Sequence, residues 1–274
     1  MKRNILSISN VCMFSIIALL SCKKEISKLP PTMEGLNTEA GLQKAGEKTN
    51  TYYGPQAQMG NGKARSFFIM SGAGNPVELG VELTAGAFSG LAAEGHVAYQ
   101  LLLHHKAQDL TAFNHIVVNW NPDGHGPLFL FGKPHFDFHF FTISTAAQLA
   151  IPAYTPGSMH DILPAAPYRP LGFVPTPGGE VEMGKHWADI IHPVIPGNFT
   201  HTMIYGSYNG AMIFVEPMIT VNYLQSLTQK VSIPYNQPMQ YMESNTWYPT
   251  VYNMYTNEAK TKYYVTLSNF IKST

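Results

Sequence analysis

The segment GKPHFDFHFFTIS, residues 132–144, alternates phenylalanine with ionisable side chains, and this alternation is typical of a β-strand. Successive side chains of a β-strand point to opposite faces, so the phenylalanines between Phe136 and Phe140 share one face and His135, Asp137 and His139 share the other. The phenylalanine face is the better core face. The segment therefore predicts a strand whose His/Asp face looks into a cavity, a barrel interior or solvent.

The rest of the chain favours a mainly β fold. Tyrosine, phenylalanine, proline and glycine are plentiful, and charged residues make up 12% of the 274 residues, about half of ordinary usage. Extended candidates separated by turn residues lie at 66–71, 77–83, 97–104, 115–120, 135–144, 201–205 and 211–216. Many short strands punctuated by Gly and Pro predict a barrel or sandwich of antiparallel strands with a few short helices.

Two stretches predict helices, and one predicts an irregular segment. Thr84 is a suitable N-cap for a short helix over 84–91. A longer helix is expected over 217–229, because Pro217 suits a first helical position and apolar residues recur at threes. Prolines are too frequent between 151 and 179 for regular structure, so we expect an ordered loop or lid there.

The N-terminus has the pattern of a secretion signal. Lys2 and Arg3 precede an apolar run over 11–20, which is too short to span a bilayer, and Ser21-Cys22 follows. Small Ser21 before Cys22 resembles the lipobox of bacterial lipoproteins, in which the cysteine becomes the lipid-carrying first residue. The alternative is a soluble secreted protein with a chance cysteine.

The domain organisation follows from this pattern. We expect a lipoprotein signal peptide over 1–21, a flexible tether over 22–50 and a single β-rich domain over 51–274, with a possible sub-division near 120. A lipid on Cys22 would attach the protein to a membrane of the bacterial cell envelope. A short helix within the tether is the alternative for that segment.

Cysteine and charge counts exclude several classes of function. Cys12 leaves with the signal and Cys22 carries the anchor, so no cysteine remains for a disulfide, a thiolate nucleophile or a metal. Any metal must be held by His, Asp or Glu. Removal of residues 1–21 takes Lys2 and Arg3 and no acidic residue, leaving 15 of the 17 basic residues against 17 acidic ones. A near-neutral chain without a basic stripe argues against nucleic-acid binding.

Strand geometry limits what the His/Asp face can bind by itself. Residues two apart on a strand lie about 6.6 Å apart and residues four apart about 13 Å apart, so one ion reaches a two-apart pair but not all three side chains. Asp137 could instead orient a ligating histidine. Further ligands are expected from His186, from Glu216 at the end of an apolar run, and from His125, whose loop precedes the strand.

A hairpin signal places Glu216 relative to the preceding strand. Ser207-Tyr-Asn-Gly210 is a turn sequence, and a two-residue or a four-residue loop there sets Glu216 opposite Met203 or His201. Both registers predict that Glu216 and His201 share a face.

Structural explanations compete with metal binding throughout. A lone histidine in a β-protein is usually a hydrogen-bonded structural residue, and this interpretation is assigned to His96, His104, His105, His115, His160 and His192. Glu216 could simply favour a helix N-terminus. The candidate site as a whole could be a buried polar network without metal.

The order of motifs resembles a family of secreted bacterial proteins, many of them lipoproteins. The resemblance is carried from about Ser66 to Ile219 by PHFDFHF (134–140), the preceding NWNPDGH (119–125), MGKHW (183–187) and IYGSYNG (204–210) running on to EPM (216–218). The family has no assigned reaction. The resemblance implies that these motifs belong to one site, within a β-rich domain that could form a homo-oligomer.

Two hypotheses of function follow from these observations. The first is a metalloprotein or metalloenzyme of the cell envelope. Its divalent ion, which is zinc, manganese, iron or copper, would act on a small molecule. The second is a non-enzymatic binding or assembly protein, in which the histidines form a structural network and the tyrosine-rich stretch from Tyr235 to Tyr264 meets partner subunits.

Overall fold

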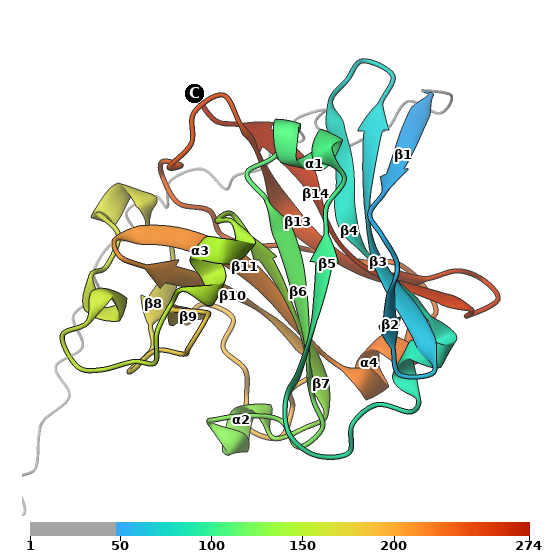
Figure 1. The fold of residues 1–274 in the computed structure, drawn as a ribbon, viewed down its shortest axis with the longest axis horizontal. Coiled ribbons are helices and arrows are strands. Elements are labelled where there is room, and N and C mark those ends of the chain that lie inside the picture. Colours follow the sequence, from blue (N-terminus) through green and yellow to red (C-terminus); the bar gives the residue numbers. More distant parts are fainter. Residues whose placement is uncertain (1–47) are drawn as a thin grey trace, which may run out of the picture. The chain divides into compact units, whose positions relative to one another are not determined.

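The computed structural model describes residues 48–274, which form two antiparallel sheets of seven strands each (Figure 1). One sheet has the order β1-β3-β4-β14-β13-β12, with β2 paired to β3. Its strands are β1 (Thr49–Tyr53), β2 (Ala57–Met59), β3 (Gly62–Ser71), β4 (Pro76–Thr84), β12 (Val231–Pro234), β13 (Trp247–Thr256) and β14 (Lys262–Lys272). The predicted signal peptide, Cys22 and the predicted tether up to residue 47 lie outside the described residues.

The other sheet carries the candidate site. Its order is β5-β6-β7-β11-β10-β9-β8. The strands are β5 (Val97–Leu102), β6 (His115–Asn121), β7 (His135–Phe141), β8 (Phe173–Pro175), β9 (Lys185–Asp189), β10 (His201–Tyr208) and β11 (Ala211–Thr220). The prediction of a mainly β fold is confirmed.

The two sheets pack face to face around one apolar core. Phe68 and Val265 of the first sheet belong to the same buried cluster as Phe138 and Ile219 of the second. Each sheet ends in edge strands, β1 and β12 in one and β5 and β8 in the other. The architecture is therefore an open sandwich and not a closed barrel.

The tyrosine-rich stretch builds the first sheet. Tyr235, Tyr252 and Tyr263 are buried in the core of this chain. Tyr255 and Tyr264 stack with their ring centroids 4.7 Å apart. Three of the tyrosines that the assembly hypothesis offered to partner subunits are thus buried inside the domain, and strand alternation directs Tyr252 and Tyr263 inward.

Helices are few and short. They are α1 (His105–Leu110), α2 (Leu128–Phe131), α3 (Thr145–Leu149), α4 (Val221–Ser226) and the 3-10 turns η1 (Ala85–Phe88), η2 (Met159–Asp161) and η3 (Ala166–Tyr168). The turn expected after Thr84 forms, but the Thr84 hydroxyl accepts from the Lys63 amide and does not cap it.

The helix expected over 217–229 forms only over 221–226. β11 continues to Thr220, and Pro217 lies within the strand opposite Met203. Met218 packs on one face of the sheet and Ile219 on the other, so burial on both faces outweighs the helical spacing of the apolar residues. The helix that forms is α4, and Thr220 caps it by accepting from the Tyr223 amide.

The segment between β7 and β9 covers the second sheet on the side away from the core. Ile151 and Met183 of this segment pack against Phe141 and Phe214 of the sheet. Within residues 48–274, none of the helices has the length and apolar character that a membrane crossing requires.

Candidate metal centre

The side of the second sheet that faces away from the core carries a row of buried polar residues. β7 lies between β6 and β11, with Asp137 paired to Asn119 on one side and to Met218 on the other. His135, Asp137 and His139 are almost completely buried, as is Glu216. The His/Asp face of β7 is therefore enclosed, and its polar atoms must find partners within the protein or bind a ligand.

The first group, called here the Asp137 triad, consists of His125, His135 and Asp137. The His125 Nε2 atom lies 3.4 Å from Asp137 Oδ2, and the His135 Nε2 atom lies 3.1 Å from Asp137 Oδ1. His125 comes from the loop between β6 and β7, which folds back so that its backbone amide donates to Phe131 O. Gly124 permits this turn, since its φ is +70° and a Cβ there would overlap Phe131 O.

Backbone carbonyls orient both imidazoles of the Asp137 triad. His135 Nδ1 lies 2.7 Å from Lys133 O, and His125 Nδ1 lies 3.1 Å from Gly126 O. A carbonyl oxygen only accepts, so each Nδ1 carries a proton. The Nε2 atom that faces Asp137 donates to the carboxylate when the ring is protonated and offers a lone pair when the ring is neutral.

The second group, called here the Glu216 triad, consists of His139, His186 and Glu216. The Nε2 atoms of His139 and His186 lie 3.4 Å and 3.6 Å from the same oxygen, Glu216 Oε2. Each residue comes from a different strand: β7 and β11 are adjacent, and β9 lies beyond β10. In both triads, two imidazole nitrogens and one carboxylate oxygen lie within 4.8 Å of one another, so that each group could hold a metal ion.

A β-bulge puts Glu216 on the site face. The turn at Asn209 and Gly210 joins Tyr208 to Ala211, but the register shifts after Gly206, and Glu216 pairs with Ile204. The expected common face of Glu216 and His201 is therefore wrong. One extra residue in β11 exchanges the faces, and His201 points to the core side, where its Nδ1 lies 2.9 Å from Tyr252 Oη.

Gly206 makes room for an aromatic ring at the centre of the Glu216 triad. Gly206 pairs with His186 in β9 and Phe214 in β11. A Cβ on Gly206 would overlap the Phe214 ring. That ring packs edge-on against His139, with centroids 4.9 Å apart, and lies 5.5 Å from His186. Phe214 thus holds both imidazoles in place.

The two carboxyl groups have opposite pKa shifts. Burial alone would raise the pKa of Asp137, but contacts with His125 and His135 hold the pKa of this carboxyl well below its ordinary value. Burial raises the pKa of Glu216 well above its ordinary value, and the charge of Asp137 adds to the shift. Burial also lowers the pKa of His139 to about 3 and that of His186 to about 4. Both imidazoles therefore stay neutral, which is the form that ligates metals.

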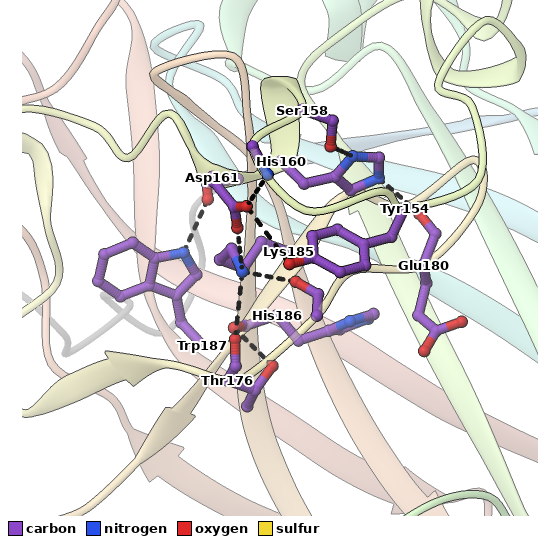
Figure 2. A network of polar contacts seen from close by, with 12 residues as sticks. Tyr154, Ser158, His160, Asp161, Thr176, Glu180, Lys185, His186 and Trp187 are labelled. Atoms are coloured by element: carbon purple, nitrogen blue, oxygen red, sulfur yellow. Dashed lines mark hydrogen bonds and ion pairs between the residues drawn. The ribbon is translucent and has the colours of Figure 1, made fainter.

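A polar network next to His186 anchors the covering segment, as Figure 2 shows. Lys185 is buried, its Nζ atom lies 3.0 Å from Asp161 Oδ1, and it donates to the carbonyls of Thr176 and Gly178. Adjacent residues of a strand point in opposite directions, so Lys185 binds Asp161 and the two carbonyls on one side of β9 while His186 faces Glu216 on the other.

All six residues proposed from the sequence as metal ligands lie in these two triads. Sequence reasoning missed Asn121, whose Nδ2 donates to Asp137 Oδ2 at 2.6 Å, and it placed His96 among isolated structural residues. His96 Nδ1 lies 2.5 Å from Asn121 Oδ1. The available signal was the spacing of Asn119 and Asn121, which puts both amides on one face of the strand next to β7.

Each triad reaches solvent through one histidine. The side chains of His125 and His186 are 31% and 23% exposed, whereas the other four residues are almost fully enclosed. A separate cavity of about 190 Å³ is lined by aromatic side chains that include Tyr241 and Tyr248, and none of the six triad residues lines it. Access to the triads is therefore from the side of His125 and His186.

Comparison with known proteins matches a part of the chain that precedes the triads. Residues 71–120 match a family model described as "TTHB210-like: Hypothetical protein TTHB210". The match runs from the last residue of β3 to the last residue but one of β6, and it includes Asn119. Comparisons with curated proteins and with solved structures give no match. The chemistry of the triads is therefore argued from their geometry.

Proposed function

We propose that this protein is a metal-dependent protein of the bacterial cell envelope, in which a divalent ion held by His139, His186 and Glu216 acts on a small molecule. The ion would serve as a Lewis acid or activate a water molecule. Zinc, manganese, iron and copper all accept imidazole and carboxylate ligands, so the donor set favours this group of metals over calcium and magnesium.

One observation carries this proposal: three metal-binding atoms converge, and two of them are buried without a hydrogen-bond partner. His139 Nε2 and Glu216 Oε2 are fully buried without a hydrogen bond. Such atoms are costly unless a ligand or a shared proton satisfies them. Three protein ligands also leave a fourth position free, which is typical of catalytic sites and not of structural zinc sites.

Metal content is the direct test. We expect the purified protein to retain a divalent ion after dialysis, and Glu216→Gln and His186→Ala each to lower occupancy strongly. His160 lies outside both triads but is a poor control, because it is fully buried with its Nδ1 atom 3.1 Å from Ser158 Oγ. His192 is the better control, because its side chain is 74% exposed.

The rival function is a binding or assembly protein whose triads are structural. The raised pKa of Glu216 supports this alternative, because a protonated carboxyl could share its proton with a neighbouring imidazole and satisfy the triad without metal. A wild-type protein that stays metal-free after incubation with zinc, manganese, iron and copper would favour the rival and contradict the metal-dependent function.

Attachment to the cell envelope is proposed from the sequence around Cys22. The basic start, the short apolar run and Ser21-Cys22 support lipid attachment at this cysteine. We expect Cys22→Ala to leave an unprocessed or released protein. Membrane fractionation and lipid labelling of this variant test the proposal, and an unchanged distribution and labelling would contradict it.

A further inference from the structure

The Asp137 triad contains metal-binding atoms that the Glu216 triad does not use. His135 and Asp137 are almost completely buried. His135 Nε2 and Asp137 Oδ1 lie 3.1 Å apart, yet neither atom has a hydrogen-bond partner. Because Lys133 O fixes the proton of a neutral His135 on Nδ1, the neutral ring sets a lone pair of nitrogen against a lone pair of oxygen. A cation between them would turn this repulsion into attraction.

The second side of the Asp137 carboxylate is already occupied. Asn121 Nδ2 donates to Oδ2 at 2.6 Å, and Asn121 is itself held by His96 at 2.5 Å. Oδ1 is left without a donor. A carboxylate fixed by an amide through one oxygen and free at the other is the arrangement found around metal ligands, where outer residues orient the inner ones.

One ion cannot serve both triads. His135 and His139 are four residues apart on strand β7, which separates their backbones by about 13 Å. Ligand atoms must lie about 2 Å from the metal. Donor atoms come within 4.8 Å of one another inside each triad, so each has its own place for an ion.

We propose that His125, His135 and Asp137 bind a second divalent cation, so that this face of the sheet holds two ions per chain. The inference rests on the proposed function, because it adds an ion to a protein that already holds one in the Glu216 triad. His125 is the exposed member and comes from a loop, so the second ion enters from the loop side and keeps its open coordination positions towards solvent.

Counting ions in the purified full-length protein tests this inference. The protein is stripped with a chelator, incubated with Zn²⁺ or Mn²⁺ in separate experiments, freed of unbound metal and analysed for metal per chain. We expect two ions in the wild type and one in His125→Ala. Glu216→Gln should also retain one ion, and the exposed control His192→Ala should retain two. Circular dichroism checks that each variant is folded. If His125→Ala does not fold, His125→Asn takes its place.

The possible results separate the two proposals. If the wild type binds one ion per chain, the second site does not exist. The variant that loses this ion then shows which triad holds it. No ion at all overturns both. If folded His125→Ala and His125→Asn both keep two ions, the Asp137 triad is not the second site. Two ions that fall to one in His125→Ala, with the other lost in Glu216→Gln, support both proposals.

Discussion

The Asp137 triad and the Glu216 triad share a donor set but differ in the charge of their carboxyl groups. In the metal-free protein the pKa of Asp137 lies well below its ordinary value, and that of Glu216 lies well above it. Both side chains are buried, so burial itself does not explain the difference. Each carboxyl faces two imidazoles, but His125 and His135 lower the pKa of Asp137, and Asn121 donates to its Oδ2 atom. The two imidazoles beside Glu216 do not lower its pKa, and its Oε2 atom has no donor.

Two carboxyl groups that are equally buried can therefore differ in charge, one ionised and the other protonated. The Asp137 triad is prepared as an anion and should attract a cation without losing a proton from its carboxyl. The Glu216 triad must lose a proton before its carboxylate can ligate, so its affinity should rise more steeply with pH. Three substitutions test whether the two triads differ in this way.

The largest effect is expected from Asp137→Asn in the metal-free protein. Removing the buried charge leaves His125 and His135 without their counter-ion, which should cost about 3 kcal/mol at neutral pH. The depressed pKa means that the stability from ionised Asp137 is present above its unfolded pKa of about 3.9 and is lost as pH falls through the folded pKa. Urea unfolding at several pH values measures this. Asp123→Asn, an exposed acid in the same loop as His125, is the control and should change stability by less than about 0.5 kcal/mol.

A smaller loss is expected from Gly206→Ala, and it should be confined to the Glu216 triad. The added Cβ displaces the Phe214 ring from His139 and His186, which should cost about 2 kcal/mol as overpacking. One ion per chain should be lost, and the Asp137 triad should keep its own. Phe214→Leu in the same chain should recover part of the stability. Full retention of both ions would show that the ring does not position the imidazoles.

The smallest effect, of opposite sign, is expected from Glu216→Gln. A raised pKa means that the contribution of Glu216 to stability is present below its unfolded pKa and is lost as pH rises through the folded pKa. Glutamine cannot ionise, so the variant does not lose this stability at high pH. The metal-free variant should therefore be more stable than the wild type at pH 8, by about 1 kcal/mol. Saturating zinc should reverse the order, because only the wild type gains metal-binding energy at this triad. Thermal unfolding with and without zinc measures both orders.

Much of the fold could be predicted because each strand carries its own alternation. The segment 135–144 shows which side chains face the core, and the structure buries Phe136, Phe138 and Phe140 in the sheet interface. The predictions failed where two elements compete for the same residues. Met218 fits a helical spacing with Val221 and Leu224, but pairing with the neighbouring strands β7 and β10 keeps it in an extended conformation.

The candidate site was less predictable than the fold. Strand periodicity placed His135, Asp137 and His139 on one face, but it could not show which of them would share a ligand. One ion with several recruited residues was expected, and the structure instead sorts six side chains into two triads. Asn121 was missed because its importance depends on the pairing of β6 with β7, which is a contact between separate segments.

The sequence by itself determined the alternation of β7, the absence of cysteine ligands after residue 22 and the presence of histidines and carboxylates in separate motifs. These are local properties, because they depend on residue types and on the period of a strand. The tertiary structure alone decided which motifs meet. A single extra residue in β11 turns Glu216 towards His139 and turns His201 towards the core. Register belongs to a pair of strands and not to either one, and for that reason the grouping into triads could not be found from the chain alone.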